Sequence, residues 1–257
     1  MKLMSKTGSN AGRKVALVTG AATGIGREVA IRMARAGLAV GINYSKSQTE
    51  AEETLALVQA QGGEGILLKG KIGSDAVARE IVARCVGEWG GLDVVVNNAA
   101  TTHFIGLTDL ESANDEVWQD IFSVNVFGGF QICRAAAPHL KARHGNIVNI
   151  SSVAAASGVG SSIPYSASKA AVNTMTKSLS KALAPEVRVN AVAPGPVKTR
   201  WLKDHQQMID AAVAQTPLKR AADPGDIADA VMFLALGTTL VTGQIVVVDG
   251  GRTLSGV

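Results

Sequence analysis

The chain has 257 residues, a mass of 26.4 kDa and a sequence pI near 9.1, with 47% hydrophobic and 18% charged residues. This composition supports a core covered on both sides, while the longest apolar runs are too short to span a bilayer. Residues 1–14 hold four basic residues and no acidic one, and the remaining 21 basic residues balance 21 acidic ones. With only 4% aromatic residues and no stripe of basic residues, the chain is not expected to bind nucleic acid.

The N-terminal segment and the cysteines indicate the domain organisation and the cellular compartment of the protein. We expect residues 1–12 to form a disordered basic tail and residues 13–257 to form one domain. No charged segment followed by an apolar run opens the chain, and Cys85 and Cys133 lie inside helix-like patterns. We therefore predict a cytoplasmic protein with buried thiols. We also predict no metal site, because the histidines are not at the spacing of metal ligands.

Strand-like and helix-like patterns alternate along the chain. Short apolar runs predict strands at 15–19, 40–43, 66–68, 92–96, 147–150, 187–192 and 245–248. Apolar residues at helical spacing predict helices at 25–36, 47–60, 75–89, 115–141, 164–183 and 224–237. This alternation is typical of an α/β protein, and we predict a single-domain Rossmann fold whose doubly wound, seven-stranded parallel sheet carries helices on both faces.

Polar and helix-weakening residues refine these helices. Ser74 and Asp223 are expected to cap the helices that follow them, with Pro224 in the first turn of the second one. The helix at 115–141 contains Gly128-Gly129 and Pro138, which weaken a helix interior. We expect close packing or a bend there.

Three glycines lie between the first strand and the first helix. Gly20, Gly24 and Gly26 leave room for a pyrophosphate to approach backbone N–H groups at the positive end of the helix. An ordinary turn is the alternative, but the position directly before an amphipathic helix favours dinucleotide binding.

A tyrosine and a lysine four residues apart form the second chemical motif. Tyr165 and Lys169 lie on one face of a predicted helix, and Ser152 follows the buried strand at 147–150. A phenol with a pKa near 10 becomes a useful acid and base near neutrality when a cation stabilises the phenolate, so we expect Lys169 to lower the pKa of Tyr165. Such a pair also occurs by chance, and its context decides.

Together, Thr-Gly-Ala-Ala-Thr-Gly-Ile-Gly at 19–26, Ser152 and the Tyr165/Lys169 pair resemble the short-chain dehydrogenase/reductases over about residues 14–252. The pattern is closest to that of 3-oxoacyl-(acyl-carrier-protein) reductase-like members. The resemblance implies that Tyr165 is the acid/base, Ser152 polarises the carbonyl, Lys169 holds the nicotinamide ribose, and Asn125 supports a proton-relay water. It also implies a cofactor site made of Gly20, Thr23, Gly24, Ile25, Gly26, Tyr44, Ser45, Lys46, Ile72, Asn98, Ala99, Tyr165, Lys169, Val197 and Thr199.

The cofactor is predicted from the end of the second strand. Enzymes that use NAD usually place a carboxylate on the ribose diol there, whereas this chain has Tyr44 followed by Ser45-Lys46. A neutral site beside an ammonium tolerates a 2′-phosphate, so we prefer NADP and keep NAD as possible. Where the family often has Asp-Val this chain has Lys71-Ile72, and its Asn-Asn-Ala-Gly motif ends in Ala100, which indicates that this position needs no positive φ.

The substrate is predicted only as a class. The loops at 101–112 and 153–163 and a lid at about 200–221 should surround it, and Trp201 and Leu202 favour a small, partly apolar carbonyl compound. One alternative is a 3-oxoacyl-(acyl-carrier-protein) reductase of fatty-acid synthesis. Another is a non-catalytic NADP-binding scaffold or sensor.

Assembly and carrier docking are further expectations from the resemblance. The helices from Asp115 and Pro164 and the stretch at 248–251 should pair subunits into a homotetramer. Carrier-dependent relatives dock their acidic carrier on two arginines near the cleft mouth. Arg143 matches the first, but Glu186 stands in the segment where the second is expected. We therefore expect free or coenzyme-A-bound substrates to be reduced at least as well as carrier-bound ones.

Overall fold

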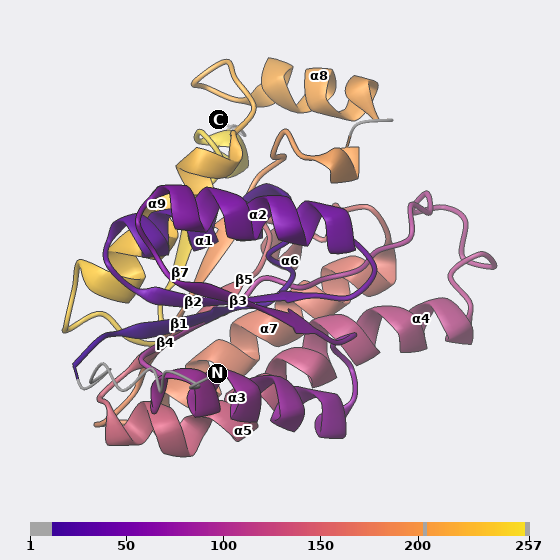
Figure 1. Ribbon diagram of the computed structural model, residues 1–257. Coiled ribbons are helices and arrows are strands. Elements are labelled where there is room, and N and C mark those ends of the chain that lie inside the picture. The colour runs from indigo at the N-terminus through magenta and orange to yellow at the C-terminus, as the bar shows by residue number, and fades with distance from the viewer. Residues whose placement is uncertain (1–11, 203–204, 255–257) are drawn as a thin grey trace.

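The computed structural model describes residues 12–202 and 205–254, so most of the predicted tail at 1–12 lies outside the described residues. Seven strands form one sheet (Figure 1). They are β1 (Val15–Val18), β2 (Ala39–Tyr44), β3 (Gly65–Lys69), β4 (Val94–Asn97), β5 (Asn146–Ile150), β6 (Arg188–Pro194) and β7 (Ile245–Val248). Each overlaps one of the seven predicted strands.

All neighbouring strands are parallel, in the order β3-β2-β1-β4-β5-β6-β7. The chain builds outward from β1 to β3 and then returns to place β4 on the other side of β1. Loops that leave β1 and β4 therefore run in opposite directions, which opens a crevice at the carboxyl ends of the central strands. The predicted doubly wound Rossmann fold is confirmed.

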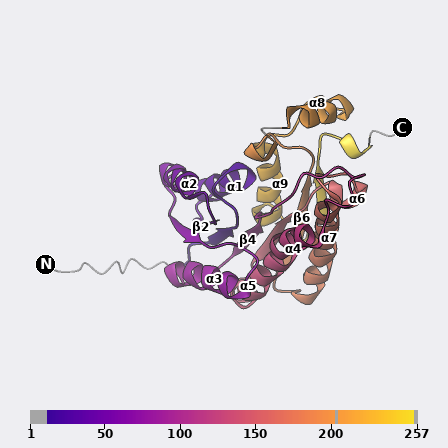
Figure 2. The same cartoon turned by 90° about the vertical axis from the view of Figure 1, so that its right-hand side faces the viewer.

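Helices cover both faces of the sheet. They are α1 (Gly24–Arg35), α2 (Gln48–Ala60), α3 (Asp75–Trp89), α4 (Asp115–Phe122), the π-helix η1 (Ser123–Gly128), α5 (Gly129–Ala142), α6 (Ala154–Ser157), α7 (Ile163–Ala182), the 3₁₀ turn η2 (Arg200–Leu202), α8 (Gln206–Gln215), α9 (Pro224–Leu236) and the 3₁₀ turn η3 (Arg252–Leu254). In Figure 1, α1, α2 and α9 lie on one side of the sheet and α3, α5 and α7 on the other. Figure 2 shows α8 outside these layers, beyond α9.

The core consists of one cluster on each face. Successive residues of a strand point to opposite faces. Val18 accordingly packs with Met33 of α1 and Ile227 of α9, while Leu17 packs with Leu140 of α5 on the other side. Because both faces are covered, the strands read as continuous apolar runs instead of alternating ones. Cys85 and Cys133 are free and buried, as predicted.

The helix expected at 115–141 consists of three consecutive helical segments, α4, η1 and α5. α4 runs into the wider turns of η1, and α5 continues through Pro138. A Cβ at Gly128 would collide with Ile72 Cγ2, so the expectation of close packing at the glycine pair is confirmed. The π-helix at this place was not predicted.

Four further details can be compared with the sequence expectations. Ser74 occupies the N-cap position of α3, but its side chain makes no capping hydrogen bond, so that prediction is wrong. The start of α9 is as expected, since Asp226 accepts a 2.8 Å hydrogen bond from the Asp223 N–H. The loop at 153–163 and the lid at 200–221 contain the unpredicted helices α6 and α8. Ala100 is not among the residues with positive φ, as expected.

Candidate active site

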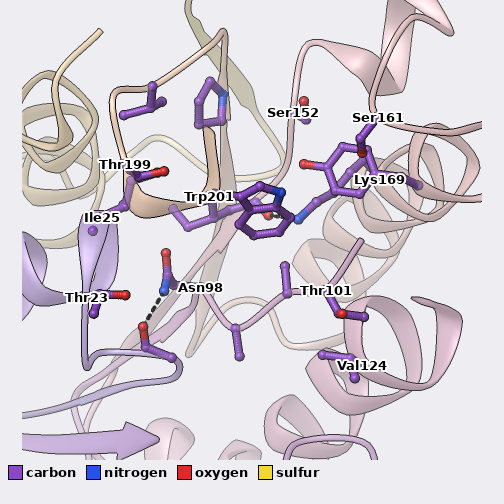
Figure 3. Close-up of a pocket in the computed structure, with 18 of the residues that line it drawn as sticks. Thr23, Ile25, Asn98, Thr101, Val124, Ser152, Ser161, Lys169, Thr199 and Trp201 are labelled. Carbon is purple, nitrogen blue, oxygen red and sulfur yellow. Dashed lines mark hydrogen bonds between the residues drawn. The ribbon is translucent and has the colours of Figure 1, made fainter. Parts of the chain in front are cut away.

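Three predicted catalytic side chains line one cavity of about 740 Å³ at the carboxyl edge of the sheet. Ser152 follows β5, and Tyr165 and Lys169 lie on the first turns of α7. That helix starts where Ser162 Oγ accepts a 3.3 Å hydrogen bond from the Tyr165 N–H. Figure 3 shows Ser152 and Lys169 in the same pocket as Thr199 and Trp201, which come from the far side of the crevice.

Burial controls the charge states of this pair. Desolvation raises the pKa of Tyr165 to about 12, and a hydrogen bond with the Ser152 side chain opposes the rise. Desolvation also lowers the pKa of Lys169 to about 8. The Lys169 ammonium lies 5.7 Å from the centre of the Tyr165 ring, yet the expected lowering of the phenol pKa is not found in the protein alone. At neutral pH Tyr165 is a protonated phenol and Lys169 is mostly an ammonium.

The fourth residue, Asn125, lies in η1 behind the cavity wall. Its Oδ1 accepts a 2.8 Å hydrogen bond from the Thr101 N–H, and its Nδ2 donates to Thr101 O at 3.1 Å and to Ser168 Oγ at 3.0 Å. Its side chain therefore fastens the loop after β4 to α7. A second cavity of about 10 Å³, lined by Asn125 and Lys169, has room for about one water molecule. Asn97, which also lines it, has an Oδ1 without a partner among the described residues.

The glycine-rich turn fits a dinucleotide. Gly24 has φ +58°, a conformation that side chains disfavour, and it opens the N-terminus of α1 to the cavity. A Cβ at Gly26 would lie 2.5 Å from both Asn98 Nδ2 and Gly20 O, so only glycine lets the helix pack this closely. Asn98 Nδ2 in turn donates to Thr19 O and Gly20 O at 3.0 Å (Figure 3).

The predicted cofactor residues lie along this same cavity. Gly26 packs behind the turn instead of lining it. The lining residues are Gly20, Thr23, Gly24, Ile25, Tyr44, Ser45, Lys46, Ile72, Asn98, Ala99, Tyr165, Lys169, Val197 and Thr199. The cavity thus runs from the end of β2, across the glycine turn, to the Tyr165 side chain.

Aromatic side chains form the other end of the cavity. The Trp201 ring meets the Tyr165 ring edge to face at 6.2 Å between centroids. Phe104, from the loop at 101–112, stacks on His205 of the lid at 3.9 Å. The lid and this loop therefore touch at this end of the cavity. In the same loop, His103 Nε2 lies 3.1 Å from Asp120 Oδ2.

Two side chains in this cavity were not singled out from the sequence. Phe104 was an aromatic residue in a loop already expected to surround the substrate, which is a usable signal. Arg200 contacts Ser47 and Glu50 across the crevice. Nothing in the local sequence pairs it with a segment so distant in the chain.

The carrier-docking expectation required Arg143 to lie at the mouth of the cleft. In its own chain, Arg143 does not lie there. Its guanidinium donates to Gly90 O at 3.4 Å and lies 3.9 Å from Asp93, whose carboxylate accepts from the Val15 N–H. These residues mark the amino ends of β1 and β4, the opposite edge of the sheet. Glu186 lies 3.9 Å from Lys141.

Over residues 12–202 and 205–254, no helix is long and apolar enough to cross a membrane. Within the same ranges, no group of three or more His, Cys, Asp or Glu side chains could hold a metal ion.

The chain resembles known proteins over nearly its whole length. A family model described as enoyl-(acyl carrier protein) reductase matches residues 20–253. A putative ketoacyl reductase of the granaticin polyketide synthase from Streptomyces violaceoruber is 41% identical over 244 residues, covering 93% of this chain and 96% of that protein. A putative short-chain dehydrogenase/reductase from Burkholderia xenovorans superposes with a TM-score of 0.90 at 35% identity, covering 95% and 99% of the two chains. A short chain dehydrogenase from Burkholderia cenocepacia, solved in complex with NADP, superposes with a TM-score of 0.87 at 31% identity, covering 93% and 98%.

Proposed function

Because the chain belongs to the short-chain dehydrogenase/reductase family and is an NAD(P)-dependent oxidoreductase, we propose that it reduces a small, partly apolar ketone or aldehyde with NADPH. Tyr165 is the proposed acid. One observation carries the proposal: the Tyr165, Ser152 and Lys169 side chains line the same cavity as the glycine-rich turn. The same cavity therefore offers a binding place for a dinucleotide and a proton donor.

The chain's own residues supply the proton chemistry. When bound, the reduced nicotinamide supplies the hydride for the carbonyl carbon. Tyr165 donates its phenolic proton to the carbonyl oxygen, and the Ser152 hydroxyl donates a hydrogen bond to the same oxygen as negative charge develops. Because burial holds the pKa of Tyr165 at about 12, the phenol is protonated at neutral pH, which is the form that reduction requires.

Lys169 and Asn125 act after this transfer. The Lys169 ammonium, 5.7 Å from the ring centre, stabilises the phenolate that remains. The small cavity between Lys169 and Asn125 has room for a water molecule that returns a proton. Asn125 is held by Thr101 and Ser168, so it keeps this cavity in shape.

NADPH is preferred over NADH for two reasons. The residue at the end of β2 is Tyr44, which brings no carboxylate to repel a 2′-phosphate, and Ser45 and Lys46 line the cavity beside it. The Burkholderia cenocepacia relative is solved with NADP. NADH remains a possible second cofactor.

The apolar end of the cavity supports the proposed substrate class. Phe104, Val159, Trp201 and Leu202 line it near Tyr165. The granaticin relative carries the name ketoacyl reductase, which fits reduction of a ketone. Reduction of acyl groups on a carrier protein remains the alternative, although Arg143 lies at the far edge of the sheet.

Turnover of NADPH tests the proposal. The protein is mixed with NADPH and a panel of ketones, aldehydes and 3-oxoacyl thioesters, and the loss of reduced-cofactor absorbance is followed. Oxidation of NADPH with at least one ketone or aldehyde supports the proposal. Tight NADPH binding without turnover on any member would favour the non-catalytic scaffold instead.

A further inference from the structure

One side chain of the lid reaches the adenosine end of the cavity. Arg200 is the first residue of η2, and its Nη1 donates a 2.7 Å hydrogen bond to Glu50 Oε1 on α2. Its Nη2 donates a 2.8 Å hydrogen bond to Ser47 Oγ, at the N-cap position of the same helix. The base of the lid is therefore tied to the segment that follows β2.

The groups around Arg200 suit a phosphate. Ser45 and Lys46 directly precede Ser47, whose hydroxyl accepts the hydrogen bond from Arg200, and all four residues line the same cavity. The Ser47 side chain makes no capping hydrogen bond to α2 and faces the guanidinium instead. Charged donors of this kind form the strongest hydrogen bonds to phosphate oxygens.

Glu50 is the group that would oppose an anion at this place. Its carboxylate lies in an ion pair with Arg200, which neutralises it. An arginine fork has five N–H donors, and the bonds to Glu50 and Ser47 use two of them. The same guanidinium can therefore hold a phosphate while it screens Glu50.

We propose that Arg200 is a ligand for the 2′-phosphate of NADPH. A residue of the lid then contributes to the choice between NADPH and NADH. The inference rests on the proposed use of NADPH and adds a residue to its recognition. Its place on the lid has a consequence for the substrate end. Trp201 is the next residue and packs against Tyr165, and a Cβ at Gly24 would lie 3.3 Å from Thr199 Cγ2, on the other side of Arg200. Arg200 thus fixes the base of the lid between the glycine turn and the catalytic ring.

Binding measurements on cofactor fragments test this assignment. Dissociation constants are measured by calorimetry for adenosine 2′,5′-bisphosphate and 5′-AMP, which differ in the 2′-phosphate, and for NADPH and NADH. We expect Arg200→Gln to weaken the two 2′-phosphorylated ligands at least tenfold, about 1.4 kcal/mol, and the other two less than twofold. Arg220→Gln is the matched control, because Arg220 lies in the same lid and pairs with Asp226 instead.

Several outcomes would overturn the assignment. Equal losses for all four ligands would mean that Arg200 holds the pyrophosphate or only the lid, and no loss would remove it from the site. Full recovery of affinity in the Arg200→Gln/Glu50→Gln double variant would mean that Arg200 only neutralises Glu50. The assay needs no turnover, so a 2′-phosphate effect in a protein that reduces no carbonyl compound would sink the proposed reaction and support this inference.

Discussion

The Lys169 ammonium donates a 2.8 Å hydrogen bond to the carbonyl oxygen of Ile150, the last residue of β5. Both residues are buried, and Ser152 follows Ile150 by two positions. This bond therefore fixes the face of α7 that carries Tyr165 against the strand end that leads to Ser152. Lys169 positions the site in addition to supplying a charge.

Replacing Lys169 should change how stability depends on pH. Burial lowers the pKa of Lys169 from 10.5 to about 8, so between these values the unfolded chain binds a proton that the folded protein has lost. The free energy of unfolding should then rise as the pH rises through this window. We expect the rise between about pH 8 and pH 10 in urea unfolding, and its loss in Lys169→Met. The opposing effect of Tyr165 begins only above its ordinary pKa of 10. An identical pH dependence in both proteins would show that burial does not lower the pKa of Lys169.

Cofactor choice should depend on Tyr44. The wild-type protein should show a higher kcat/KM with NADPH than with NADH, and Tyr44→Asp should erase or reverse the difference, because a carboxylate there repels the 2′-phosphate and binds the ribose diol. Tyr44→Asn is the control, because asparagine has nearly the shape of aspartate without its charge. It shows the effect of losing the Tyr44 ring alone, at a residue that is 7% exposed. A wild-type preference for NADH would contradict the argument.

Assembly can be tested at the exposed phenylalanines of η1 and α5. Phe127 and Phe130 are 57% and 41% exposed and lie three residues apart, so they form an apolar pair where η1 meets α5. Light scattering should give about four times the 26.4 kDa chain mass for the wild type, and a smaller mass for Phe127→Glu. Leu57→Glu, on α2 and 41% exposed, should leave the assembly unchanged. A wild-type monomer at micromolar concentration would count against the prediction.

The fold could be predicted because β1, β2 and β5 are buried along their whole length and appear in the sequence as apolar runs. Apolar residues at helical spacing between the strands gave most of the long helices. Gly20 and Gly24 follow β1 directly, so their role could be inferred from order alone. The π-helix at Ser123–Gly128 could not be predicted, since no local pattern marks it and Gly128 packs there against Ile72, which is far away in the chain. Spacing places Tyr165 and Lys169 together but says nothing about burial, which overrides the expected effect of Lys169 on the phenol pKa.

Contacts between side chains on opposite sides of the crevice also could not be predicted from the sequence. The stacking of Phe104 on His205 and the reach of Arg200 to Glu50 depend on how the lid folds over the sheet. The position of Arg143 was misjudged for the same reason, because local order does not tell which edge of the sheet a helix end approaches.

The carrier question is decided by comparing one 3-oxoacyl chain on coenzyme A and on its carrier protein. Because Arg143 lies beside Asp93 at the amino edge of the sheet, we expect kcat/KM for the coenzyme A form to be at least as high. Arg143→Ala should change neither value by more than about twofold. A tenfold preference for the carrier-bound form, about 1.4 kcal/mol, that disappears in Arg143→Ala would restore the fatty-acid assignment.

The central claim is that Tyr165 donates the proton, and Tyr165→Phe tests it most directly. The variant keeps the ring that packs against Trp201 and removes the hydroxyl, and loss of a general acid typically costs about a hundredfold to ten-thousandfold. For a ketone that the wild type reduces, kcat and the NADPH dissociation constant are measured side by side in both proteins. We predict a fall in kcat of at least about a hundredfold with NADPH binding unchanged. Retention of most of the wild-type kcat in Tyr165→Phe would contradict the account, because the proton would then come from another group.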